Sequence, residues 1–271
     1  MLIALAIGGF AASAGATAKR AVFLGVTTST ENSGLLAVLV DAFEASHQTE
    51  LRAVTAGSGA VLSLAAHGDV DLVLVHSPVD EERFVAEGLG VERRPVMHNR
   101  FVIVGPEDDP ADVAAKESAA GAFAAIAARH ALFVSRGDQS GTHRAEQRLW
   151  RAAGIDIEGG DVGDWYRRSG AGQGATLNIA ANLGAYALTD EATWETFNNR
   201  SGLAMLFSSD RPEMINRYSV ILVNPARFPG INADGARRFA DWLTSADGRA
   251  VISSFRANGR QLFHPADQAS E

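Results

Sequence analysis

The sequence predicts an α/β protein with two lobes, each a mostly parallel sheet flanked by helices. Short apolar runs of strand length alternate with amphipathic segments along the chain, and this alternation is typical of parallel sheets covered by helices. An acidic, proline-bearing stretch from Glu107 to Pro110 separates two such series. The length of 271 residues is sufficient for two modest domains.

Composition excludes several classes of function. The hydrophobic share of 46% fits a globular protein with a sizeable core, and the net charge of -8 argues against a nucleic-acid partner. Without cysteine, the chain has no disulfide, no thiolate nucleophile and no lipid-modified N-terminal cysteine. The seven histidines lack the spacing of metal ligands, so we expect neither a metal site nor a cofactor.

Residues 1–18 are apolar, uncharged and rich in small residues. Two small-x-small patterns lie near their end, which is typical of a cleavage site, so we expect a signal peptide over residues 1–18 and export to the periplasm. The alternative is a buried N-terminal helix. The run is too short for a membrane span.

In the first series, apolar runs predict strands, and helical periodicity or a preceding glycine-serine loop predicts helices. The strands are expected at residues 21–26, 51–55, 71–75 and 101–104, and the helices after residue 34 and at residues 60–66 and 79–87. Thr28 and Glu31 have the spacing of a capping box.

In the second series, an alanine-rich helix or helix pair is expected at residues 111–129. Further helices are expected at 143–153, after the glycine segment to 183, at 191–197 and at the C-terminus, and strands at 131–134, 185–188, 203–207 and 218–223. The runs at 101–104 and 218–223 are interpreted as a hinge of two strands that cross between the lobes. This assigns residues 19–105 and 223–271 to lobe 1, and residues 106–222 to lobe 2.

The segment Ser135–His143 has the features of an anion site. It follows an apolar strand and opens a helix, whose N-terminal amides and dipole attract anions. Arg136 adds a permanent charge, while Ser140 and Thr142 add hydroxyl donors. Gly141 lets the backbone approach a ligand closely. Asp138 is interpreted as the cap of a helix that begins near Gln139, with a role as ligand acceptor as the alternative.

Other strand–loop–helix junctions are also rich in hydroxyls or glycine. Thr28 and Ser29 follow the first strand, Ser58 follows the second, and Thr176 ends a glycine loop. Ligands of open α/β sheets lie beyond the carboxyl ends of strands. A dianion held between the lobes could therefore draw donors from both.

The two hydroxyl-rich segments, Thr27–Leu36 and Ser135–His143, together resemble those of the tungstate-binding proteins of tungstate ABC importers, the TupA family. The resemblance covers residues 22–265 and includes the glycine segment Gly172–Leu177 and the Asn224-Pro225 turn. It implies a type II periplasmic-binding-protein fold, a monomer that binds tungstate or molybdate between its lobes, and delivery to a membrane permease.

Matching the family's motifs position by position implies a set of ligand-binding residues. These are Thr28, Ser29, Ser58, Arg136, Ser140, Gly141, Thr142 and Thr176. The chain departs from the family pattern at Val26, where threonine is usual, and at Gln173, where methionine is frequent. Neither departure removes a ligand donor.

The donor set fits a dianion whose oxygens only accept hydrogen bonds, as those of tungstate do. A phosphate or sulfate site of the same fold is the first alternative, since hydrogen phosphate would benefit from a carboxylate acceptor such as Asp138. An enzyme acting on a phosphorylated or carboxylated substrate is the second. It would need a general base, and near the motif only Asp138, His143 and Glu146 are available.

Overall fold

The computed structural model describes residues 20–159 and 162–266. The predicted signal peptide lies outside the described residues. Within these ranges no helix is long and apolar enough to cross a membrane.

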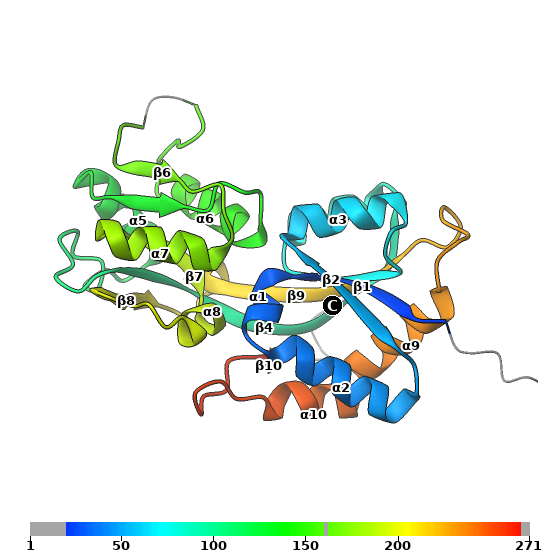
Figure 1. Cartoon of the computed structure of the whole chain (residues 1–271). Coiled ribbons are helices and arrows are strands. Elements are labelled where there is room, and N and C mark those ends of the chain that lie inside the picture. Colours follow the sequence, from blue (N-terminus) through cyan, green and yellow to red (C-terminus); the bar gives the residue numbers. More distant parts are fainter. Residues whose placement is uncertain (1–19, 160–161, 267–271) are drawn as a thin grey trace, which may run out of the picture.

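Two long strands join the two halves of the molecule (Figure 1). They are β4 (Gly90–Pro106) and β9 (Ile215–Val223), which pair antiparallel with Asn99 opposite Asn216. The predicted crossing strands are thus confirmed, although β4 begins 11 residues before the apolar run that predicted it. Its first part carries charged side chains at residues 92–94, so this part of the strand has no apolar run from which it could be predicted.

The first half is built on a sheet in the order β10-β4-β9-β3-β1-β2, with β1 parallel to both β2 and β3. Its further elements are β1 (Val22–Thr27), α1 (Thr28–Asn32), α2 (Leu35–His47), β2 (Leu51–Ala56), α3 (Ser58–His67), β3 (Leu72–Val75), α4 (Pro78–Ala86), α9 (Ala233–Thr244), α10 (Ala246–Ser254) and β10 (His264–Pro265).

In the second half, β7 and β8 pair antiparallel with the end of β4, and β5 pairs in parallel with β6. Its elements are α5 (Ala119–Ala128), β5 (Phe133–Ser135), α6 (Gly141–Ala152), β6 (Tyr166–Arg168), α7 (Gln173–Leu183), β7 (Ala187–Asp190), α8 (Glu191–Thr196), β8 (Leu203–Ser208) and the 3-10 turn η1 (Pro212–Met214).

This arrangement confirms the predicted α/β architecture. Strands that follow one another through helices pair in parallel, whereas the pairs made by the crossing strands β4 and β9 are antiparallel. The numerical boundaries of the lobes, after residues 105 and 222, stay predictions. We call the half that contains β1 to β3 lobe 1, and the half that contains α5 to α8 lobe 2.

Several local predictions are wrong. The alanine-rich segment forms one helix, α5, that begins only at Ala119, where the Ser118 hydroxyl caps it. The predicted capping box does not form, because Thr27 is the N-cap of α1 without a side-chain bond and Glu31 accepts from the Thr55 hydroxyl instead. The short strands β6 and β10 have no apolar run to reveal them.

Buried apolar side chains form separate cores on either side of the hinge. In lobe 1, one core packs α2, α9 and α10 against the sheet, and another packs α3 and α4 against its other face. In lobe 2, one core surrounds Trp150 of α6, and another lies between α7 and β4. The strands β1, β2 and β3, whose carboxyl ends face the site, are therefore packed against helices on both faces of their sheet.

Candidate functional site

Helix α6 begins at Gly141, with Ser140 as its N-cap. The Ser140 hydroxyl oxygen accepts from the His143 amide at 3.2 Å. Asp138 lies before the cap, and its Oδ1 accepts from the Ser140 amide at 3.2 Å. The prediction that Asp138 caps a helix beginning near Gln139 is therefore wrong, because Gln139 has a φ of 60° and still belongs to the loop.

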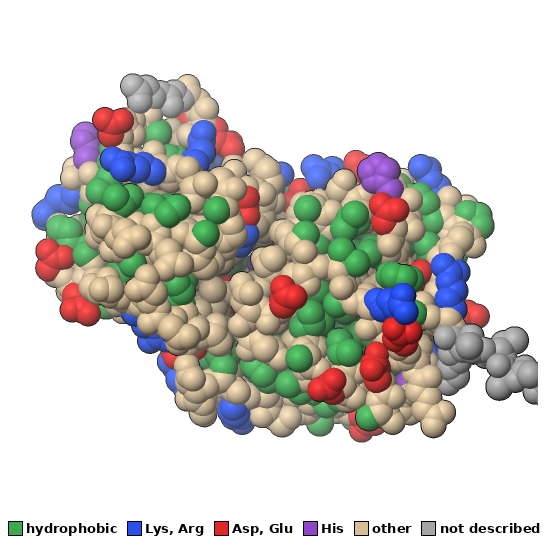
Figure 2. All heavy atoms as spheres, in the orientation of Figure 1, with side chains coloured by type: hydrophobic (Ala, Val, Ile, Leu, Met, Phe, Trp, Pro, Cys, Tyr) green, Lys and Arg blue, Asp and Glu red, His purple; other side chains and the backbone are tan. Residues whose placement is uncertain are grey.

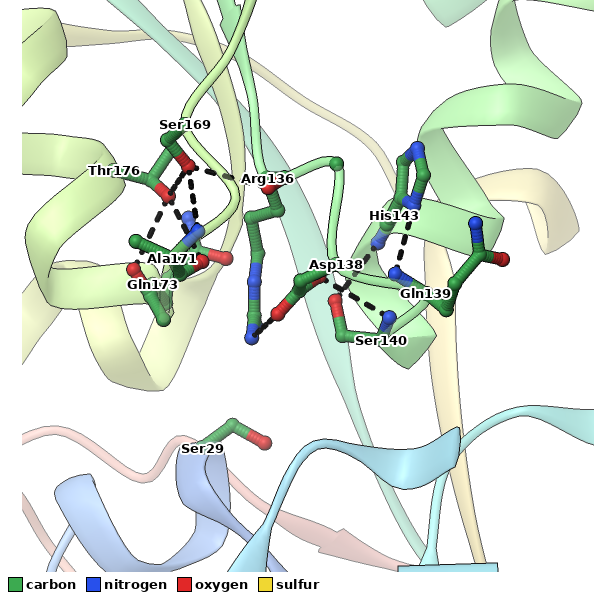
Figure 3. A network of polar contacts seen from close by, with 12 residues as sticks. Ser29, Arg136, Asp138, Gln139, Ser140, His143, Ser169, Ala171, Gln173 and Thr176 are labelled. Carbon is green, nitrogen blue, oxygen red and sulfur yellow. Dashed lines mark hydrogen bonds and ion pairs between the residues drawn. The ribbon is translucent and has the colours of Figure 1, made fainter. Parts of the chain in front are cut away.

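Arg136 is 4% exposed and extends from the end of β5 toward lobe 1. Figure 3 shows its side chain directed at the region of Ser29 in α1, with Asp138 beside it. One guanidinium nitrogen lies 2.5 Å from Asp138 Oδ2, while Nε has no partner. Asp138 thus binds Arg136 and the loop backbone, and the guanidinium keeps a free donor.

Unpaired donors gather at the predicted site. Among the described residues, five buried side-chain nitrogen or oxygen atoms have no hydrogen-bond partner. Three of them belong to predicted ligand residues: Ser58 Oγ, Arg136 Nε and Thr142 Oγ1. Buried polar groups are normally paired, so this concentration marks a site that is completed by something other than the chain.

Backbone donors add to this group. The amides of Gly141 and Thr142 lie in the first turn of α6, where no intrahelical acceptor exists. Helix α3 likewise begins at Ser58, after the N-cap Gly57, which has no side chain to cap the helix. The two helix N-termini thus present amides and the positive ends of their dipoles, which favour an anion.

The N-termini of α3 and α6 meet across the two lobes. A β-carbon at Gly57 would lie 3.8 Å from the Ser140 β-carbon, and one at Gly141 would lie 2.6 Å from His76 Nδ1. Arg144 of α6 also approaches Asp80 of α4 at 3.4 Å. Figure 2 shows the lobes in contact, with only a narrow groove between them. The structure therefore represents a closed arrangement.

In lobe 1, Ser29 lies at the bottom of the groove and is 2% exposed. Its hydroxyl contacts Thr27 Oγ1 at 3.1 Å, His76 Nε2 at 3.2 Å and Tyr218 Oη at 3.4 Å. The neighbouring Thr28 is half-buried.

The Thr176 hydroxyl serves the glycine loop before α7. It lies 2.8 Å from Ser169 Oγ and 3.1 Å from the Gly172 carbonyl. Ser169 Oγ in turn donates to the Arg136 carbonyl at 3.2 Å. Thr176 is therefore connected to Arg136 through Ser169, which sequence reasoning missed, although Ser169 lies only three residues before the glycine segment.

His76 was also missed, since in the sequence it only ends the third strand. It is 4% exposed, and its ring stacks on Tyr218 with centroids 4.7 Å apart. Burial lowers its pKa to about 4, and the charge of Arg136 acts in the same direction. Its place at the carboxyl end of a parallel strand is the signal that could have identified it.

The candidates for a general base have other roles. Glu146 lies in the core of lobe 2, where it accepts from Tyr166 Oη at 2.8 Å and Trp150 Nε1 at 3.1 Å. Burial raises its pKa to about 7. His143 Nδ1 accepts from the Gln139 amide at 3.0 Å. Within the described ranges, no cluster of His, Asp and Glu side chains could hold a metal ion.

Comparisons with known proteins show the family to which the chain belongs. A family model described as a PBP superfamily domain matches residues 12–247. The tungstate-binding protein TupA of Peptoclostridium acidaminophilum is 37% identical, over 98% of this chain and 95% of that protein.

Two solved structures are similar over nearly their whole length. The crystal structure of the tungstate ABC transporter from Geobacter sulfurreducens is 40% identical, with a TM-score of 0.79 over 87% of this chain and 99% of that chain. The tungstate-binding protein TupA from Desulfovibrio alaskensis is 38% identical, with a TM-score of 0.76 over 92% and 99% of the two chains.

Proposed function

Because the chain belongs to the TupA family of tungstate-binding proteins, within the PBP superfamily, we propose that it captures tungstate between its lobes for an ABC importer. The observation that carries the proposal is the cluster of buried donors without partners at Ser58, Arg136 and Thr142. We call these three residues, with the N-termini of α3 and α6, the clamp.

The chemistry of the clamp favours a fully deprotonated oxyanion. Its free groups are hydroxyl, amide and guanidinium donors, which suit four acceptor oxygens. Ser140 accepts from the His143 amide through its oxygen, so its hydroxyl hydrogen remains available. We assign ligand contact to Thr28, Ser29, Ser58, Arg136, Ser140, Gly141 and Thr142, with Thr176 shaping the loop beside Arg136.

Two observations favour this proposal over its alternatives. Asp138, the acceptor that a hydrogen phosphate would require, already accepts from Arg136 and from the Ser140 amide. An enzyme would need a poised base, but Glu146 lies in the core and His143 receives a backbone amide. We therefore propose a binding protein rather than an enzyme.

The wider role follows from the family. We place the protein in the periplasm as a monomer that delivers tungstate, or molybdate, to a membrane permease. Closure around the anion explains why donors from both lobes converge, since each lobe alone supplies half of a site.

A panel of oxyanions tests the proposal. A tight ligand raises the thermal midpoint by mass action, so tungstate and molybdate are expected to give large shifts and sulfate and phosphate small ones. Calorimetric competition between tungstate and molybdate then establishes the preference. Tighter binding of phosphate or sulfate would contradict the proposed ligand.

A further inference from the structure

His76 lies at the point where the hinge strand β9, the helix α1 with Ser29, and the N-terminus of α6 meet. Its Nε2 is 3.2 Å from Ser29 Oγ, and its Nδ1 is 2.8 Å from Asn216 Oδ1. On the side of lobe 2, its ring and carbonyl lie so close to Gly141 that a β-carbon there would approach both to 2.6 Å. A histidine so placed contacts the proposed ligand residue Ser29 in lobe 1 and the N-terminus of α6 in lobe 2.

The hydrogen bonds around Asn216 determine the tautomer of His76. The Asn216 amide nitrogen donates to Asn99 Oδ1 at 2.8 Å and to Tyr218 Oη at 3.1 Å. The Asn216 side-chain oxygen is therefore the acceptor that faces His76. It follows that Nδ1 of His76 carries the hydrogen and that Nε2 is unprotonated. Because a buried acceptor requires a donor, the Ser29 hydroxyl points its hydrogen at Nε2.

The same chain of bonds continues into lobe 2. Asn99 donates to Asp190 Oδ1 at 3.1 Å, and Asp190 caps α8 by accepting from the amide and hydroxyl of Thr193. These bonds leave Asn216 no freedom to flip, because a flip would turn its oxygen toward the Asn99 oxygen, and a flip of both amides would turn the Asn99 oxygen toward the Asp190 carboxylate. The orientation of His76 is thus held from both lobes.

This orientation conflicts with a ligand that only accepts hydrogen bonds. If Ser29 donates to an oxyanion oxygen, its hydrogen must leave Nε2, and Nε2 becomes a buried acceptor without a donor. A proton from solvent removes the conflict, because imidazolium donates through Nε2 to Ser29 Oγ and through Nδ1 to Asn216. The dianion's field favours that charge.

We propose that His76 is a positioning residue that takes up one proton as the oxyanion binds, and so turns the Ser29 hydroxyl from His76 toward the ligand. The proton adds to Nε2, the Ser29 O–H bond rotates without breaking, and the ligand stays deprotonated. This inference rests on the proposed function and adds a coupling between tungstate capture and pH.

Other charged and titratable groups surround His76. The charge of Arg136 opposes protonation, and burial keeps the ligand-free ring neutral, with a pKa of about 4. The remaining groups are Tyr218 and Arg217 on β9, Arg148 on α6, Glu213 in η1, Asp190 at the start of α8, Asp80 and Glu81 on α4, and Glu31 on α1. Several of the carboxylates have partners: Glu81 contacts Arg93, Asp80 contacts Arg83, and Asp190 accepts from Thr193.

Calorimetry of tungstate binding in buffers of different ionisation enthalpy measures the protons taken up. At pH 6 we expect between about 0.5 and 1 proton per tungstate, with affinity falling by up to about tenfold for each pH unit between the pKa of His76 in the free protein and its pKa in the complex, and levelling off above the latter. Binding without proton exchange would overturn the inference and leave the proposed function intact. Absence of any tungstate binding would contradict the proposed function itself.

The matched variant is His76→Gln, whose side-chain oxygen can accept from Ser29 but cannot gain a proton. It should bind tungstate with no proton uptake and with a flat pH profile. If it takes up as many protons as the wild type, the protons go elsewhere and the inference is wrong. Should this variant not fold, ¹⁵N NMR of histidine in the wild type decides, since Nε2 must become protonated when tungstate is added.

Discussion

Two clusters of buried polar side chains lie next to each other between the lobes and differ in how completely they are paired. In the hinge cluster, formed by Asn99, Asp190, Asn216 and Tyr218, each side chain has a hydrogen-bond partner. In the clamp, Ser58, Arg136 and Thr142 each bury an atom without one. Both clusters are equally inaccessible to water, so burial alone does not separate them.

The difference separates structure from function. A buried donor without a partner lowers stability by about 1–3 kcal/mol, so the clamp weakens the ligand-free protein and gains most when an anion arrives. The hinge cluster has no such deficit and holds β4 against β9 with or without ligand. Substitutions in the clamp should therefore affect binding, and those in the hinge cluster should affect folding.

The largest expected effect is on the clamp's only charge. Arg136→Ala removes the guanidinium and leaves Asp138 unpaired, so tungstate affinity should fall by about 2–5 kcal/mol, as for other desolvated charge pairs. Calorimetry measures it, and Arg151→Ala is the control, because Arg151 is exposed in the last turn of the same helix. A loss below tenfold would show that Arg136 does not contact the ligand.

The next largest effect should fall on folding. Asn216→Ala removes bonds to His76, Asn99 and Tyr218 and leaves buried groups unpaired, which should lower the free energy of unfolding by about 2–4 kcal/mol. Denaturant unfolding without ligand tests it, with the exposed Asn199→Ala as control. An unchanged free energy of unfolding would contradict the claim that the hinge cluster stabilises the fold.

A third buried group sharpens the comparison, since Glu146 is fully paired but ionisable. Its pKa rises from 4.5 to about 7 on folding because it is buried, so the folded state binds more protons between these values and stability falls as pH rises through that window. At pH 8, Glu146→Gln should be more stable than wild type by about 1–3 kcal/mol, and at pH 4 the difference should vanish. Thermal unfolding against pH measures both, and a difference that does not change with pH would contradict the assignment.

The smallest effects should come from the clamp hydroxyls. Ser58→Ala and Thr142→Val remove buried atoms that have no partner in the ligand-free protein, so the free energy of unfolding should not fall and should rise by up to about 1 kcal/mol. Tungstate affinity should fall by about 1–2 kcal/mol for each hydroxyl, because a bond to a charged ligand is lost. If either substitution destabilises the ligand-free protein as much as Asn216→Ala does, the hydroxyl serves folding rather than ligand binding.

The ligand-binding residues stay predictions, whereas the structure corrects one local role that sequence reasoning assigned near them. Arg136, Ser140 and Thr142 could be proposed because an arginine together with several hydroxyls at the start of a helix exceeds what a single N-cap requires. The role of Asp138 was misassigned, since capping depends on where the helix begins, and the positive φ of Gln139 moves that start to Gly141. The first part of β4 was missed because strands with charged side chains lack an apolar pattern.

The sequence alone determined the α/β class, the two crossing strands and the chemical type of the ligand. These follow from local patterns: apolar runs, helical periodicity and donors at helix starts. Only the tertiary structure decided which donors stay unpaired and how His76 is oriented, because both depend on partners far away in the chain. His76 meets Asn216 and Ser29 at separations of 140 and 47 residues, and no local pattern encodes such contacts.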